Sequence, residues 1–117
     1  MPDEHPEKFP KSSRVFRQRD FDRVFKSGRV IADSVLVIHS SANGQDRWRL
    51  GISISRKVGN AVLRNYWKRL IREAFRRERI NAPVFFDLVV RPRKGAVPDG
   101  PAIRRSLANC MRKISRA

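Results

Sequence analysis

The amino-acid sequence predicts a single α+β domain, an α/β sandwich in which helices pack on one sheet. The chain of 117 residues is long enough for one compact domain with one modest core. Its apolar residues change from helical spacing to alternation and back again along the chain. The order strand, long helix, strand over residues 47–91 indicates a crossover between parallel strands, which the general rule makes right-handed.

The first residues are expected to form an arm and a short helix. Residues 1–13 contain three prolines and few apolar side chains, so we assign them to an irregular arm before a single domain over residues 14–117. A helix is predicted over residues 20–27, with Asp20 as its N-cap and Gly28 directly after its end. Its apolar face carries Phe21, Val24 and Phe25.

Alternating segments predict the strands that follow this helix. Residues 35–40 form one strand, a shorter strand over residues 29–32 precedes it, and Asn43-Gly44 predicts a turn. Residues 47–55 then alternate between two faces. The face expected in the core carries Trp48, Leu50, Ile52 and Ile54. The other face either receives a phosphate backbone or is merely solvated, and it carries Arg47, Arg49, Gly51, Ser53 and Ser55.

A long helix, a central strand and a last helix complete the predicted domain. The long helix covers residues 62–79, after Gly59 and a capping Asn60. Residues 85–91 are mostly apolar and predict a central strand, and a last helix begins near Gly100. The apolar stripe of the last helix carries Ile103, Leu107, Cys110, Met111 and Ile114. We also assign to the core Trp48, Trp67 and Phe75.

The charge of the chain indicates a polyanionic partner. Lys and Arg number 27 against 11 acidic residues, which gives a formal net charge of +16. No apolar run could span a bilayer and no secretory leader is recognisable, so we expect nucleic acid and a cytoplasmic location, with no membrane. The candidate metal ligands His5, His39 and Cys110 are not clustered, and no nucleophile–base pair is apparent. We therefore expect no metal site and no catalytic residue in the protein.

The most basic segment is the long helix and the loop before it. Residues 55–79 contain nine Lys or Arg residues, opposed by Glu73 and Glu78 alone. A merely solvated helix would mix both signs. Here the charges share one sign, and they include Arg56 and Lys57 beside a helix N-terminus, which favours phosphate binding.

This segment closely resembles a known family. The run RKVGNAVLRNYWKRLIREAF resembles the signature of the bacterial ribonuclease P protein component, and DFDRVFKSGR and DLVVRPR resemble its flanking segments in matching order. The resemblance covers residues 14–115. The family usually reads Arg-Asn-Arg at the helix start, whereas this chain reads Arg64-Asn65-Tyr66.

The resemblance implies a fold and two binding surfaces. The implied order of helices and strands is αβββαβα, with a four-stranded sheet, three helices and a left-handed crossover, as in the ribosomal protein S5 domain 2-like fold. The long helix and its preceding loop would bind the catalytic RNA through Arg56, Lys57, Asn60, Arg64, Asn65, Lys68, Arg69 and Arg72. A cleft between the first helix and the sheet would hold the 5′ leader of precursor tRNA through Phe21, Phe25, His39 and Arg49. From the residues alone, one of the two phenylalanines could instead be core, and His39 could be an ordinary half-buried histidine.

The implied activity is endonucleolytic removal of the leader by a ribonucleoprotein. Hydrolysis would belong to Mg²⁺ held by the RNA subunit and substrate, so the protein alone would not cleave. The partners would be the catalytic RNA and precursor tRNA, with no obligate protein partner. Composition alone leaves open two alternatives, a ribosomal protein and a non-specific DNA-binding protein.

Overall fold

The computed structural model describes residues 17–78, 80 and 83–116, and the described residues form an α+β fold. The arm assigned to residues 1–13 lies outside them. In chain order the elements are α1 (Gln18–Ser27), β1 (Arg29–Ala32), β2 (Leu36–Ala42), β3 (Arg49–Ile52), the short 3₁₀ helix η2 (Arg56–Val58), α2 (Ala61–Arg76), β4 (Phe86–Pro92) and α3 (Gly100–Arg116). The predicted order αβββαβα is confirmed.

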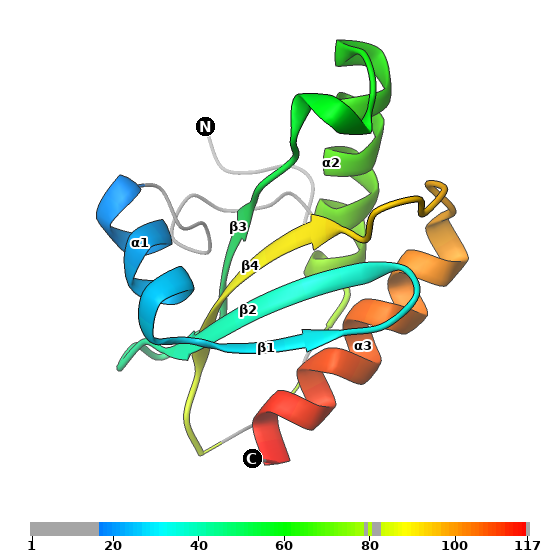
Figure 1. Cartoon of the computed structure of the whole chain (residues 1–117). Helices are drawn as coiled ribbons and strands as arrows, with labels where there is room; N and C mark the ends of the chain where they lie inside the picture. The colour runs from blue at the N-terminus through cyan, green and yellow to red at the C-terminus, as the bar shows by residue number, and fades with distance from the viewer. Residues whose placement is uncertain (1–16, 79, 81–82, 117) are drawn as a thin grey trace, which may run out of the picture.

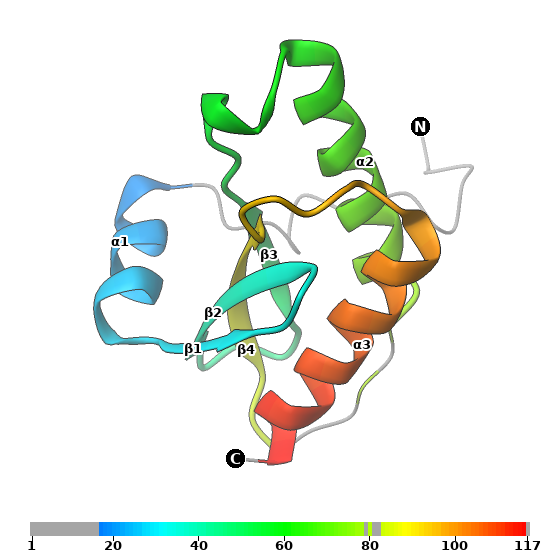
Figure 2. The ribbon, with the colours of Figure 1, turned by 45° about the vertical axis from the view of Figure 1, so that its right-hand side comes forward.

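The four strands form one mixed sheet in the order β1-β2-β4-β3. The predicted central strand is β4, which pairs with β2 antiparallel and with β3 parallel. Helix α1 covers one face of the sheet, while α2 and α3 pack together on the opposite face (Figures 1 and 2). The two faces therefore present different surfaces to a partner.

The connection from β3 through α2 to β4 is left-handed. Seen from the side of α2 with both parallel strands pointing upward, β4 lies to the left of β3 (Figures 1 and 2). The general rule predicted a right-handed crossover and is wrong here. The hand implied by the family resemblance is correct.

The main core lies between the sheet and the helices α2 and α3. Alternate residues of the strands point into it, as the sequence pattern predicted, and meet the apolar stripes of the two helices. The assignment of Trp48, Trp67, Phe75 and Cys110 to this core is confirmed, since each is less than 9 % exposed. Its largest fully buried side chains include Trp67, Leu36, Ile38, Ile71, Leu88, Ile103, Leu107, Met111 and Ile114.

Helix α1 begins earlier than predicted, and Asp20 is not its cap. The helix starts at Gln18 after Arg17, whose side chain makes no capping hydrogen bond. Asp20 instead lies in the first turn and faces Arg49 of β3. Gly28 follows the helix as predicted, and a Cβ there would lie 2.5 Å from the Ser40 carbonyl oxygen of β2. Glycine is needed because the backbones approach so closely.

Other boundaries differ from the prediction as well: β2 covers Leu36–Ala42 instead of residues 35–40, β4 covers Phe86–Pro92 instead of residues 85–91, and β3 begins at Arg49 instead of residue 47. Strand β3 ends at Ile52 instead of residue 55, and the chain then turns into η2, which begins at Arg56. Helix α2 begins after Asn60 as predicted but ends at Arg76, earlier than residue 79. Within the described residues, no helix combines the length and apolar character needed to span a membrane.

Candidate nucleic-acid interface

A glycine and a capping side chain build the start of α2. Gly59 has a φ of 157°, a backbone conformation that favours glycine, and a Cβ there would lie 2.5 Å from Leu63 Cδ2. Asn60 Oδ1 accepts a hydrogen bond from the backbone N–H of Leu63 at 2.9 Å. The cap occupies this oxygen, so any contact of Asn60 with RNA would come from its amide Nδ2. Arg56 and Lys57 are exposed in η2, directly before this turn.

Past its first turn, α2 carries a row of polar and basic side chains that we call the basic stripe, consisting of Arg64, Asn65, Lys68 and Arg72. Spacings of four residues bring Arg64, Lys68 and Arg72 onto one ridge. Asn65 and Arg72 are exposed, while Arg64 and Lys68 are half-buried. Arg64 Nε donates to the carbonyl oxygen of Gly59 at 3.2 Å, which holds its guanidinium beside the helix start. The fold thus places these residues, which are predicted to bind RNA, in one row along α2.

Arg69 lies next to this stripe in a different environment. Its Nε is 3.8 Å from Glu73 Oε1, and its guanidinium lies over the ring of Tyr66 at 5.5 Å from the centroid. Arg69 is well exposed and Glu73 is partly exposed, so the pair contributes little stability. Glu73 offsets part of the Arg69 charge, so we expect this arginine to attract phosphate less strongly than Arg72 does.

The second predicted surface lies where α1 crosses the sheet. Val24 is fully buried there, whereas Phe21 is half-buried and Phe25 is 42 % exposed. The ring of Phe25 meets that of His39 on β2 edge to face, with centroids 4.8 Å apart and an interplanar angle of 76°. Neither phenylalanine belongs to the fully buried core, which leaves their rings available at the edge of α1.

His39 is held in its neutral form by its surroundings. Burial and then the charge of Arg91 lower the pKa of His39 below its ordinary value. Arg91 Nε donates to His39 Nε2 at 3.4 Å, which leaves the ring proton on Nδ1. That Nδ1 is buried and has no hydrogen-bond partner among the described residues. The partly exposed ring therefore offers an aromatic surface beside Phe25, while its Nδ1 points into the protein.

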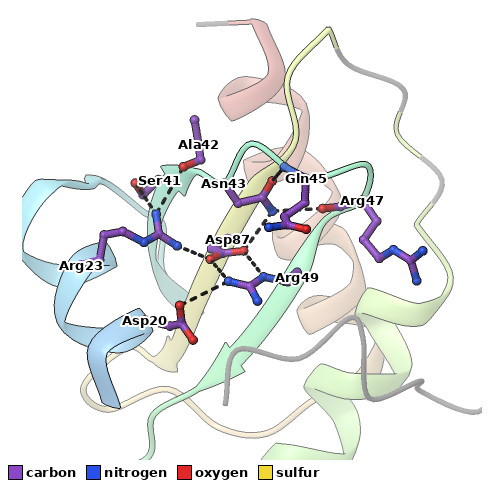
Figure 3. A network of polar contacts seen from close by, with 9 residues as sticks. All are labelled: Asp20, Arg23, Ser41, Ala42, Asn43, Gln45, Arg47, Arg49 and Asp87. Atoms are coloured by element: carbon purple, nitrogen blue, oxygen red, sulfur yellow. Dashed lines mark hydrogen bonds and ion pairs between the residues drawn. The ribbon is translucent and has the colours of Figure 1, made fainter. Parts of the chain in front are cut away.

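Arg49, the fourth residue predicted for this surface, belongs to a network around a buried carboxylate (Figure 3). Its Nε and Nη2 donate to the two oxygens of Asp87, each at 2.7 Å, and its Nη2 lies 3.4 Å from Asp20 Oδ1. Arg23 of α1 also donates to Asp87, and Asn43 Nδ2 donates to Asp87 Oδ1 at 2.9 Å. One cationic partner comes from the neighbouring strand β3 and the other from α1 on the face of the sheet, so the network ties α1 to β3 and β4.

The network decides the charge states at its centre. Burial alone would raise the pKa of Asp87, but hydrogen bonds from Arg49 and Asn43 and the nearby positive charges hold it below its ordinary value. The same hydrogen bond to Asp87 raises the pKa of Arg49. Arg49 is thus matched to a carboxylate, and its geometry suits the positioning of α1 better than direct contact with a phosphate.

Sequence reasoning missed Asp87 and Arg23. A signal for Asp87 was present, because one acidic residue within an apolar central strand requires a buried partner. Nothing local distinguished Arg23 from its neighbours. Among the described residues, no cluster of three His, Cys, Asp or Glu side chains could hold a metal ion.

Comparisons with known proteins agree with one another. A family model described as "Ribonuclease P" matches residues 9–115. The chain is 38 % identical over 113 residues to the "Ribonuclease P protein component" of Thermotoga maritima, covering 92 % of this chain and 97 % of that protein. It is 39 % identical over 109 residues to that of Desulfosudis oleivorans, covering 92 % and 90 %.

Solved structures show the same likeness. The RNase P protein of Staphylococcus aureus aligns with a TM-score of 0.77 and 36 % identity, over 89 % of this chain and 96 % of that one. The RNase P protein of Thermotoga maritima aligns with a TM-score of 0.77 and 38 % identity, over 86 % and 96 %.

Proposed function

Since this chain belongs to the family of ribonuclease P protein components, and so acts in tRNA processing as the protein subunit of ribonuclease P, we propose that it supplies two binding surfaces and no catalytic group. It is part of an endoribonuclease holoenzyme, and the ribonuclease P RNA is its partner. The family membership removes the alternatives of a ribosomal protein and a general DNA-binding protein.

The first proposed surface binds the catalytic RNA. It consists of η2, the start of α2 and the basic stripe. The observation that carries this proposal is the row of cations of one sign that runs from the exposed Arg56 and Lys57, past the capped start of α2, along the helix to Arg72. Backbone N–H groups and cations converge there, and both favour phosphate oxygens.

The second proposed surface holds the single-stranded 5′ leader of precursor tRNA. Phe25 and His39 present partly exposed rings between α1 and the sheet, and Phe21 lies one helical turn before Phe25. Unpaired bases stack on such rings whatever their sequence. Arg91, exposed beside His39, can attract the leader phosphates. Arg49 would act indirectly, by holding α1 in place.

Chemistry and binding are divided between the two subunits in this proposal. Mg²⁺ held by the RNA subunit and the substrate would supply the hydrolytic chemistry. The cations of the protein offset the repulsion between the phosphates of the two RNAs, so less Mg²⁺ is required. The proposed location is the cytoplasm, and the proposed complex needs no second protein.

Reconstitution tests this division. The protein alone should not cleave precursor tRNA, whereas protein plus ribonuclease P RNA should remove the leader at Mg²⁺ concentrations at which the RNA alone is nearly inactive. Cleavage is measured by gel with a 5′-labelled precursor. Metal-dependent cleavage by protein shown to be free of RNA would contradict the proposal.

A further inference from the structure

A second exposed ridge runs along α2 beside the basic stripe. Val62, Tyr66, Arg69 and Glu73 follow one another at spacings of three or four residues, which places them on one line of the helix surface. Val62 is 78 % exposed and Tyr66 is 40 % exposed. Neither belongs to the main core or to the residues packed against it.

The fold gives no reason for these apolar side chains. Valine and tyrosine are poorer helix formers than the lysine, arginine or glutamate usual at exposed positions. Val62 gains little from burial, and Tyr66 keeps 40 % of its surface exposed beside Arg69, so packing in the core explains neither side chain. A large aromatic side chain exposed among cations is typical of a surface that binds nucleic acid.

Arg69 and Glu73 hold the tyrosine ring ready for a ligand. The Arg69 guanidinium lies over the ring, 5.5 Å from its centroid, and Glu73 approaches the same arginine at 3.8 Å. The cation–π contact covers part of the ring and restricts its rotation. The remaining exposed surface can receive a flat group, and the neighbouring Val62 extends it with further apolar area.

We propose that Tyr66 stacks on an unpaired nucleobase of the ribonuclease P RNA, so that α2 binds this RNA through a stacking contact as well as through phosphates. The inference rests on the proposed function of the basic stripe. An unpaired base is required because a base within an A-form helix is stacked on its neighbours and offers no free face. Stacking involves no counterion release, so this contact should be insensitive to salt.

Substitutions at Tyr66 separate stacking from charge. The dissociation constant of the protein–RNA complex is measured across a range of salt concentrations. Tyr66→Ala and Tyr66→Leu should each weaken binding by about tenfold without changing the salt slope, whereas Tyr66→Phe should bind within about twofold of the parent protein. Equal binding by the parent, Ala and Leu variants would overturn the proposal.

Two controls make the result specific. Val97→Ala removes another exposed apolar side chain, 75 % exposed in the loop before α3, and should leave binding unchanged. Arg72→Ala tests the proposed function itself and should lower the log–log salt slope by just under ~1.

If Arg72→Ala weakens binding and Tyr66→Ala does not, the proposed RNA binding by the basic stripe is supported and the stacking contact is refuted. If neither has an effect, α2 is not the RNA-binding surface. Thermal melts should show all variants folded, since the side chains of Tyr66, Val97 and Arg72 are exposed.

Photo-crosslinking identifies the source of the base. Tyr66 is the sole tyrosine of the chain, so a peptide carrying it is readily recognised by mass spectrometry. Ultraviolet irradiation of the complex with ribonuclease P RNA should attach a nucleotide to this peptide before any precursor tRNA is added. A crosslink that forms only after precursor tRNA is added would assign the stacked base to the substrate and overturn the proposal.

Discussion

Val24, rather than either neighbouring phenylalanine, anchors α1 on the sheet. It is fully buried, while Phe21 is half-buried and Phe25 is 42 % exposed. The three residues share one helix face, so the sequence pattern could not rank them. Because the three residues differ in burial, their substitution should affect stability and precursor-tRNA binding to different degrees.

Phe25→Ala should therefore weaken leader binding and spare the fold. Loss of one stacking contact predicts about a tenfold loss of holoenzyme affinity for precursor tRNA, with little change for mature tRNA. Stability should fall by much less than the ~3–5 kcal/mol typical of a truncated core phenylalanine. Val24→Ala is the matched control: it should cost about 2 kcal/mol in the free energy of unfolding and show no precursor-specific defect. An equal loss for precursor and mature tRNA with Phe25→Ala would remove Phe25 from the leader surface.

His39 should make stability depend on pH near neutrality. Burial and the Arg91 charge lower its pKa in the folded chain below the value of about 6.5 expected in the unfolded chain. Between these two values the unfolded chain binds the proton more readily, so the free energy of unfolding falls as the pH drops below about 6.5. Urea unfolding at pH 7.5 and pH 5 should show a larger loss for the parent protein than for His39→Gln. Parallel pH dependence in the two proteins would show that the His39 pKa is not lowered. His5 is present in both proteins and does not affect the difference.

At the level of elements, the network around Asp87 fixes α1 against the sheet. Asp87 is completely buried and is bound by Arg49 of β3 and Arg23 of α1. Val24 adds an apolar contact, but apolar contact is not directional. The paired hydrogen bonds of Arg49 are directional, and Asp20 connects the same arginine to the first turn of α1. The network therefore sets where the rings of Phe21 and Phe25 lie.

Asp87→Asn should loosen this arrangement. Removing the charge leaves two arginines without their central partner, which predicts a loss of about 3–5 kcal/mol in the free energy of unfolding. The affinity for precursor tRNA should fall, because α1 no longer holds Phe25 in position. Asp46→Asn is the control, since the exposed pair of Asp46 and Arg47 should have no measurable effect on the melting temperature. A stability unchanged by Asp87→Asn would mean that the network does not hold α1.

At the level of the whole molecule, the sheet separates the two proposed surfaces. Helix α1 lies on one face of the sheet and α2 lies on the other, while η2 lies past the end of β3 and leads into α2 (Figure 2). The net charge of +16 acts over the entire molecule, but the contacts at the two surfaces share no residue. Substitutions on the two faces should then act independently.

A double variant tests this independence. Arg72→Ala should weaken binding of the catalytic RNA, and Phe25→Ala should weaken binding of precursor tRNA to the assembled holoenzyme. In the double variant the loss of affinity for the catalytic RNA should equal that of Arg72→Ala alone, and the loss of affinity for precursor tRNA should equal that of Phe25→Ala alone, each to within about 0.5 kcal/mol. A clear departure from additivity would show that the two surfaces are coupled through the sheet or through the RNA.

The sequence by itself determined the element order, most of the core and the family. Alternation over residues 47–55 predicted which side of β3 is buried, and Asn60 predicted the start of α2. These features depend on residues close together in the chain, where spacing alone defines a face or a cap. The net charge and the segment around α2 indicated an RNA partner, because both are read directly from the order and composition of the residues.

Only the tertiary structure decided which side chains meet across the sheet. The sequence predicted Asp20 as a helix cap and Arg49 as a leader-binding residue. Strand pairing instead places Arg49 opposite Asp87, and the folding of α1 brings Asp20 and Arg23 to the same point. Arg49 and Asp87 are 38 residues apart, and Arg23 and Asp87 are 64 residues apart. Local spacing carries no information about such pairs. The left-handed crossover likewise depends on how whole elements pack, which is why the general rule failed and the family resemblance did not.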